Sequence, residues 1–273
     1  MLVRLSISYF LGFIFIITLL ILTGCREDYV SIDPTEPIDP TEPIEVVGPI
    51  DAIVCDSVIN ENSNLLTEGL VAYYPFNNSI NDESGFANTG DTTSIVPTVD
   101  RNMKCDGAYY FNGDDSGIII PDNEQLSFGS SFTVSVWFNA DVKTTQQIIG
   151  QKFWLDGRFR WPFALSVSGS NDFIFSIATN EGYNTAQARK TGYSVDTWYM
   201  MTGVYENSKI YLYIDGILAA EKEIEGEFFD SDLDLYIGRS PSEDYNRFKG
   251  IIDDVRIYNR ALSQNEITLL YNN

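Results

Sequence analysis

The sequence predicts an all-β fold in which two antiparallel sheets stack as a sandwich or jelly roll, with one short helix near the C-terminus. From about Leu70 onward, short runs of alternating apolar and polar residues are separated by turn residues, which is typical of half-buried strands. Aromatic residues make up 14% of the chain, with 16 Tyr and 17 Phe, and this suits strands with large packing surfaces. We therefore expect one folded domain over residues 70–273.

Residues 1–24 resemble a bacterial lipoprotein signal peptide. Arg4 supplies one positive charge, and the apolar run from Tyr9 to Leu22 fits a secretory signal but is short for a membrane-spanning helix. The run ends in Leu22-Thr23-Gly24-Cys25, which resembles the lipobox of bacterial lipoproteins. That resemblance implies that the Cys25 thiol receives a diacylglycerol and becomes the new N-terminus. The alternative is an uncleaved membrane anchor.

Residues 25–50 are expected to form an acidic, proline-rich tether. Residues 26–28, Arg-Glu-Asp, resemble the acidic sorting signal of surface-displayed lipoproteins, although ordinary linker acidity is the alternative. Residues 32–37 are repeated exactly as residues 38–43, and their prolines and acids favour an extended chain. We expect a protein secreted across the inner membrane and held by lipid alone, in the outer membrane or at the cell surface. Residues 51–69 would then lead into the folded domain.

The strand pattern is clearest in four segments. Residues 132–138 alternate strictly, and the residues on their apolar face are Phe132, Val134, Val136 and Phe138. Residues 173–177, 198–205 and 209–214 continue in the same style. Asp215-Gly216 follows the last of these and favours a tight hairpin, because both central residues of a type I′ turn need a positive φ.

One helix is predicted near the C-terminus. Ser263 to Glu266 has the pattern of a capping box, in which each of the two side chains bonds the backbone at the other residue. The residues that follow supply an apolar stripe at helical spacing, namely Ile267, Leu270 and Tyr271.

The cysteines and the charge limit the possible chemistry. With Cys25 assigned to lipid, Cys55 and Cys105 remain, and in an exported protein they form either a disulfide or two free thiols. The net charge of −22 repels phosphate backbones, so nucleic acid is not an expected partner. The chain has no histidine, which excludes Ser-His-Asp and Cys-His catalysis and histidine-ligated zinc.

Several short segments of the folded region occur in a characteristic order: LVAYYPFN (70–77), DESG (82–85), YFNG (110–113) with IIIP (118–121), FTVSVW (132–137), TWY (197–199), LYIDG (212–216), LYIG (235–238) and IIDDVRIYNRALS (251–263). This order resembles the laminin G-like (LamG) jelly rolls of the concanavalin A-like lectin/glucanase superfamily. The resemblance implies a two-sheet antiparallel jelly-roll sandwich with one short C-terminal helix. Residues 152–162, which are aromatic and basic, depart from the pattern.

The resemblance also implies a structural calcium ion. Strict alternation would place Asp253 on the same face as Ile251, Val255 and Ile257, where a carboxylate needs a compensating partner. Related jelly rolls often hold Ca²⁺ between the last strand and the region of the first, so Asn77 and Asp82 would complete the ligand set. The alternative is that Asp253 accepts hydrogen bonds from loop amides or pairs with an arginine such as Arg256.

For ligand binding, the sequence points to Trp154, Arg158, Trp161 and Tyr183. Exposed aromatic rings stack on the flat faces of sugars, and arginine binds hydroxyl groups. The alternative is that the tryptophan rings fill the rim of the core. A second aromatic face is expected to be core rather than a binding site, and it consists of Trp137, Tyr199, Tyr211 and Tyr213.

Catalysis has little support in the sequence. The retaining glucanases of the superfamily carry acids clustered as Glu-x-Asp-x-x-Glu, and this chain has no such motif. The acids in residues 221–225 and 230–234 fit solvated segments better. The sequence therefore predicts a non-catalytic, lipid-anchored module outside the cytoplasm that binds a glycan. The alternatives are a protein-binding adhesion or assembly module of the cell envelope, and a glycoside hydrolase or lyase with a cryptic carboxylate site.

Overall fold

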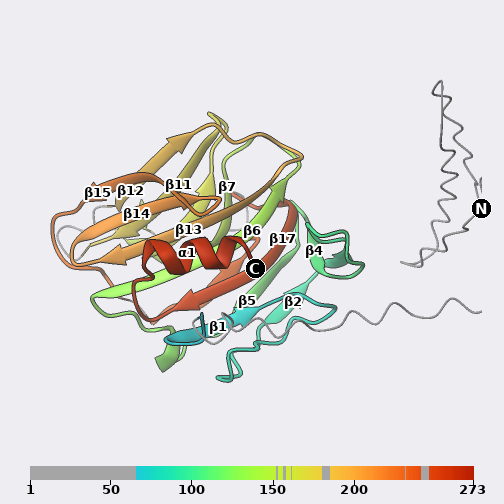
Figure 1. Cartoon of the computed structure of the whole chain (residues 1–273), viewed down its shortest axis with the longest axis horizontal. Helices are drawn as coiled ribbons and strands as arrows, with labels where there is room; N and C mark the ends of the chain where they lie inside the picture. The colour runs from blue at the N-terminus through green and yellow to red at the C-terminus, as the bar shows by residue number, and fades with distance from the viewer. Residues whose placement is uncertain are drawn as a thin grey trace, which may run out of the picture. The chain divides into compact units, whose positions relative to one another are not determined.

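Two antiparallel sheets face each other across one apolar core in this computed structural model (Figure 1). The structure describes residues 66–151, 153–155, 158–160, 162–179, 185–230, 232–240 and 246–273. Contacts divide the chain into residues 1–59 and residues 60–273, and all described residues belong to the second unit. In these ranges no helix has the length and hydrophobicity that a bilayer crossing requires.

The two sheets and their connections confirm the predicted jelly-roll sandwich. The first sheet, sheet A, has eight strands in the order β15 (Ile217–Glu223), β14 (Lys209–Ile214), β13 (Trp198–Glu206), β6 (Ser131–Ala140), β17 (Lys249–Tyr258), β4 (Ala108–Asn112) and β3 (Val96–Thr98), with β1 (Leu70–Tyr74) also paired to β17. Sheet B has seven strands in the order β12 (Thr185–Thr191), β11 (Asp172–Ala178), β10 (Phe163–Val167), β7 (Gln146–Gly150), β16 (Leu235–Ile237), β5 (Gly117–Ile120) and β2 (Asp91–Thr93). The remaining elements are a separate hairpin of β8 (Phe153–Leu155) and β9 (Arg158–Arg160), a 3₁₀ turn η2 (Glu124–Leu126) and the helix α1 (Gln264–Tyr271).

Alternation along β6 builds the core as predicted. The four residues expected on the apolar face are fully buried between the sheets, namely Phe132, Val134, Val136 and Phe138. Facing them across the core, Phe175 of β11 packs over Gly203 of β13, where a Cβ atom would lie only 2.6 Å from the phenyl ring. The absence of a side chain at Gly203 therefore allows this close contact between the sheets.

A second apolar cluster lies on the other face of sheet A, beneath α1 (Figure 1). Trp137 and Tyr213 are buried there with Ile267 and Leu270 of the helix, and Tyr211 packs against them. These three aromatic residues are core, as expected. Tyr199 instead packs against the core between the sheets, so the predicted single aromatic face is wrong in that respect. Odd-numbered residues of β13 point inward, whereas Trp137 points outward from β6.

The predicted turn and helix cap are both present. Asp215 and Gly216 have φ of 50° and 78°, the left-handed pair that a type I′ turn requires. Ser263 and Glu266 form the reciprocal capping box at the start of α1. The Arg260 guanidinium, 2.6 Å from Glu266, holds the pKa of that carboxyl at about 2, so it is ionised at neutral pH.

Replacing Ser263 with alanine is expected to destabilise the domain by about 1 kcal/mol, because the backbone N–H of Glu266 loses its acceptor. Urea unfolding followed by tryptophan fluorescence measures the change. Ser130→Ala, at an exposed position without a capping role, is the matched control and should change stability by less than about 0.5 kcal/mol. Equal effects of the two substitutions would contradict the role assigned to the cap.

Candidate functional site

A pocket of about 380 Å³ opens on the outward face of sheet B. This volume lies within the range of small-molecule sites, roughly 300–1,000 Å³. Four strands, β7, β10, β11 and β12, supply most of the lining, and Thr145, Asn246 and the loop after β10 supply the rest. The lining residues are Thr145, Gln146, Gln147, Ala164, Ser166, Ser168, Gly169, Ser170, Ile174, Ser176, Gln187, Arg189 and Asn246.

Strand register explains why this face is hollow. Phe173, Phe175 and Ile177 of β11 point into the core, so the residues between them point outward. Two cross-strand rows result, and their members in order are Gly150, Ala164, Ser176 and Gln187 in the first, and Gln147, Ser166, Ile174 and Arg189 in the second. Ala164 and Ser176 are small residues in the middle of the first row, Ser166 stands beside Ile174 in the second, and longer polar side chains stand on β12. The pocket is therefore a consequence of side-chain size along each row.

Hydrogen bonds hold the polar wall of the pocket in one arrangement. The Oε1 atom of Gln187 accepts from Arg189 Nε at 3.0 Å and Nη2 at 2.8 Å. This fixes the amide so that Gln187 Nε2 donates to Ser176 Oγ at 3.0 Å. On the other side, Arg189 Nη1 lies 3.3 Å from Asp172 Oδ2. A charged pair, an amide and a hydroxyl thus form one connected set across β11 and β12.

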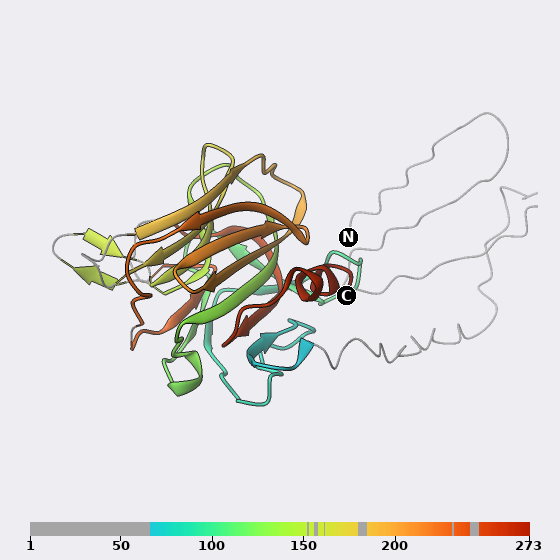
Figure 2. The ribbon, with the colours of Figure 1, turned by 60° about the vertical axis from the view of Figure 1, so that its left-hand side comes forward.

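The ligand-binding residues predicted from the sequence lie on connections between the pocket strands. Trp154 and Arg158 belong to the β8–β9 hairpin, which joins β7 to β10 and projects from the sandwich in Figure 2. The backbone of this hairpin is described, but its side chains are not. Trp161 and Tyr183 lie outside the described residues, in the β7–β10 and β11–β12 connections. Their role in binding stays a prediction.

Sequence reasoning missed the floor of the pocket. Ser166, Ser176, Gln187 and Arg189 each look like an ordinary solvent-facing residue in its own strand. A signal was present in β11, where the alternation of Phe173 to Ile177 leaves Ile174 and Ser176 on the other face. Which strands lie beside β11 depends on the tertiary fold, and the sequence pattern does not contain that information.

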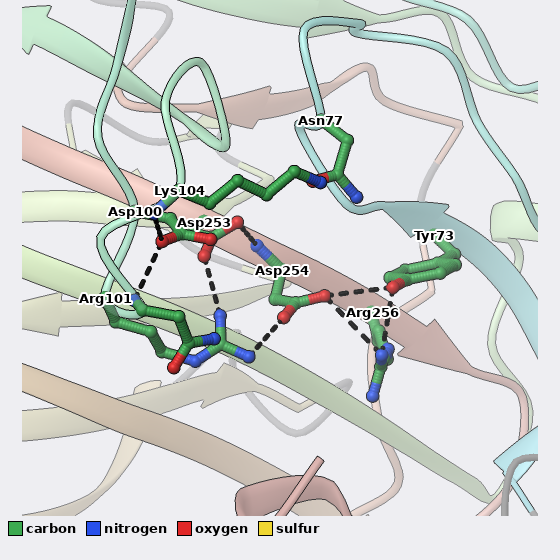
Figure 3. Close-up of polar contacts among 9 residues, drawn as sticks. Tyr73, Asn77, Asp100, Arg101, Lys104, Asp253, Asp254 and Arg256 are labelled. Carbon is green, nitrogen blue, oxygen red and sulfur yellow. Dashed lines mark hydrogen bonds and ion pairs between the residues drawn. The ribbon is translucent and has the colours of Figure 1, made fainter. Parts of the chain in front are cut away.

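Asp253 has a partner that the sequence did not suggest. Its Oδ2 lies 2.6 Å from Arg101 Nη1, while Arg101 Nη2 lies 2.7 Å from Asp254 (Figure 3). The Arg101 guanidinium also stacks 4.5 Å from the centre of the Trp137 ring. Arg256, the partner considered from the sequence, instead contacts Asp254 and the Tyr73 hydroxyl. An arginine therefore compensates the buried Asp253, but it is Arg101.

The predicted face of Asp253 also needs correction. The β17 pairing shifts register between Asp253 and Arg256, and Asp254 has φ of 46°, which marks a bulge. Ile252 enters the core before the bulge, and Val255 and Ile257 enter it afterwards. Asp253 therefore does not share a face with Val255 and Ile257. It contacts Arg101 on the outer side of sheet A instead.

The other predicted calcium ligands also have partners. Asp82 accepts from the backbone N–H groups of Tyr73 and Asn88 at 2.8 and 2.9 Å, and the Oδ1 atom of Asn77 accepts from Lys104 Nζ. Among the described residues, no group of three or more acidic or cysteine side chains could hold a metal ion. This donor set does not fit calcium as arranged. Calcium binding stays a prediction, which calorimetry with Ca²⁺ after chelation can test.

The predicted disulfide and lipid sites are only partly within the described residues. Cys105 is half-buried in the loop before β4, whereas Cys55 and Cys25 lie outside the described ranges. Pairing of Cys55 with Cys105 and lipidation of Cys25 therefore stay predictions.

Comparison with known proteins identifies the domain. A family model for laminin G type 3 domains, described as concanavalin A-like lectin/glucanases superfamily, matches residues 112–268. An adhesion G-protein coupled receptor of Danio rerio is 27% identical over 149 residues, which cover 52% of this chain and 2% of the receptor.

Several solved structures have the same fold. The binding domain of a paraclostridial mosquitocidal protein aligns with a TM-score of 0.62 and 19% identity, covering 76% of this chain and 52% of that one. The botulinum neurotoxin serotype G binding domain aligns at 0.58 and 16%, covering 74% and 50%. Domain 4 of an extracellular arabinanase from Geobacillus stearothermophilus, in complex with arabinotriose, aligns at 0.55 and 22%, covering 74% and 98%. This chain thus spans about half of the toxin domains and nearly all of the arabinanase domain.

Proposed function

The chain belongs to the concanavalin A-like lectin/glucanases superfamily, and from that premise we propose that it binds carbohydrate in the pocket on sheet B. The observation that carries the proposal is the pocket that small and polar side chains of the two cross-strand rows form on the outward face of the sheet. Sugars are recognised by convergent hydroxyl, amide and guanidinium groups, and this wall offers all three. The arabinanase domain with the same fold, solved with arabinotriose, supports this ligand class.

We propose binding without catalysis. Glycoside hydrolysis usually needs two carboxyl groups on either side of the scissile bond. The described lining of the pocket instead contains serine, threonine, glutamine, asparagine and arginine side chains. These groups suit hydrogen bonding to a ligand that is bound and released without a chemical change.

The proposal includes the lipid anchor at Cys25 predicted from the sequence. The acidic, proline-rich tether would hold the module away from a membrane surface, where the pocket is accessible to its ligand. The calcium ion predicted from the sequence is not needed by this function.

A protein-binding adhesion or assembly module is the second candidate, because large apolar side chains are exposed at one place. Ile217 and Tyr271 are 72% and 39% exposed, and a Cβ atom at Gly216 would lie 3.1 Å from Tyr271. Gln264 Nε2 donates to the Gly216 carbonyl and ties the helix to this turn. Exposed apolar patches mark many protein interaction sites.

Filling the pocket separates the two candidates. Ser166→Trp places a large ring on the floor of the pocket from an outward position, so the core is not disturbed. The full chain in detergent is screened on a glycan array, and the affinity for a bound glycan is then measured by calorimetry. We expect Ser166→Trp to weaken binding at least tenfold, a loss of about 1.4 kcal/mol.

Ser130→Trp, at an exposed position outside the pocket lining, is the matched control and should bind like the unmodified chain. Melting curves of both variants show whether the fold is intact. Unchanged glycan binding by a folded Ser166→Trp variant would move the site elsewhere. No glycan binding, together with capture of an envelope protein that Tyr271→Ser abolishes, would favour the second candidate.

A further inference from the structure

The pocket on sheet B has a charge arrangement that bears on which sugar it takes. We infer that its ligand is an uncharged, hydroxyl-rich sugar and that sugars carrying a carboxylate are excluded. This inference rests on the proposed function and adds the ligand class. It is carried by the contacts of Arg189, by the charge of Asp172 and by the neutral groups of the wall.

Arg189 is the cationic residue among those that line the described pocket, and its Nε, Nη1 and Nη2 atoms each contact another side chain of the chain. Nε and Nη2 both donate to Gln187 Oε1, and Nη1 pairs with Asp172. Arginine holds a carboxylate best through two parallel N–H bonds. An acidic sugar could engage the Nε and Nη2 pair only by displacing Gln187, and the Nη1 side of the guanidinium faces the negative charge of Asp172. Arg189 is therefore poorly placed to receive an anion.

Asp172 keeps its negative charge beside the pocket. Its Oδ1 accepts from Thr191 Oγ1 at 2.6 Å, and its Oδ2 accepts from Ser168 Oγ at 3.2 Å. These hydrogen bonds and Arg189 lower the pKa of Asp172, with the Thr191 bond contributing most. The ionised carboxylate balances the charge of Arg189 and would repel the carboxylate of an acidic sugar. The net charge of −22 on the whole chain adds repulsion at longer range.

The remaining polar wall matches hydroxyl groups. Because Gln187 Nε2 donates to Ser176 Oγ, the Ser176 hydroxyl proton is directed to another acceptor, and an outward-facing sugar oxygen can supply one. Ser166 and Ser170 line the same pocket and add hydroxyls that both donate and accept. Neutral sugars form such bonds without the cost of desolvating a charge.

Paired sugars that differ only at C6 test the inference. Oligomers of galactose, glucose and mannose are compared with oligomers of the corresponding uronic acids, using the full chain in detergent and calorimetry. For the stereochemistry that binds, the neutral member is expected to bind at least tenfold more tightly. Its affinity should change less than twofold between 50 and 500 mM NaCl, because no net charge is transferred into the site.

Asp172→Asn provides the sharper test. Without the carboxylate, Arg189 is released toward an anionic ligand, so the affinity for the uronic acid, divided by the affinity for the neutral sugar, should rise at least fivefold. Asp114→Asn is the matched control, since it makes the same change of net charge at a side chain that is 90% exposed in a different region. It should leave the preference unchanged.

Two results would count against the inference in different ways. Tighter binding of the uronic acid by the unmodified chain, abolished by Ser166→Trp, would overturn the neutral ligand class but leave carbohydrate binding in this pocket. Absence of any sugar binding that depends on Ser166 would overturn both the ligand class and the proposed function.

Discussion

Replacing Phe132 with alanine is expected to lower the free energy of unfolding by about 3–5 kcal/mol. The Phe132 ring is fully buried, and it contacts rings from both sheets and from the segment before β16. Its neighbours, with ring centroids 4.9–6.3 Å away, are Phe128, Phe163, Phe175, Tyr205 and Phe228. Alanine would leave a cavity that this rigid sandwich cannot close, in addition to the loss of apolar burial.

Urea unfolding monitored by circular dichroism measures this loss. Small domains have a total stability of about 5–15 kcal/mol, so the variant should unfold at a much lower urea concentration. Phe86→Ala removes the same atoms from a side chain that is 50% exposed and should cost less than about 1 kcal/mol. A loss below about 1 kcal/mol for Phe132→Ala would mean that this ring is not central to the core.

Replacing Arg101 with alanine is the second large effect, again about 3–5 kcal/mol at neutral pH. Asp253 is buried with 2% of its surface exposed, and Asp254 adds a second negative charge beside it. Removing the guanidinium leaves a buried carboxylate without its countercharge and removes the ring contact with Trp137. Arg101→Lys should restore only part of the loss, because a single ammonium group cannot bond both carboxylates in the same way.

The Arg101→Ala effect should depend on pH. Burial and Asp254 raise the pKa of Asp253 from 3.8 to about 7, and Arg101 opposes this shift. Without Arg101 the pKa of Asp253 in the folded state rises further. At neutral pH the folded chain then keeps a proton on Asp253 that the unfolded chain has released, and this difference destabilises the folded state as the pH rises. The destabilisation should therefore be small near pH 4 and largest at pH 8.

Urea unfolding at the two pH values measures this difference. Asp114→Ala, which removes the exposed partner of Arg247, is the control and should cost less than about 1 kcal/mol at both. An Arg101→Ala loss that is equal at pH 4 and pH 8 would show that packing on Trp137, and not charge, is the main contribution.

Local patterns predicted the fold well, because the features that define it are local. The alternation of β6, the left-handed pair at Asp215 and Gly216, and the capping box at Ser263 each depend on neighbours within a few residues. The same reasoning failed at Asp253, where a bulge reverses the faces of β17. A bulge is set by the pairing with other strands, and the alternation rule assumes that none is present.

The candidate site was only partly predictable for a related reason. Arg101 and Asp253 are 152 residues apart in the chain, so their pairing follows from the tertiary fold alone. The pocket likewise needs Ser166, Ser176 and Gln187 from three strands to lie in neighbouring positions. Aromatic residues in the connections predict sugar binding because exposed rings stack on sugars, whereas small residues on a strand carry no such local signal.

The pocket divides into parts that can change independently. Its floor consists of side chains on four paired strands, whose opposite faces hold the core, while Ser168, Gly169 and Ser170 of the loop between β10 and β11 line its rim. Substitutions in this loop could thus change the rim of the pocket without rebuilding the scaffold. Related chains could therefore differ at the rim of the pocket while they keep the same sandwich beneath it.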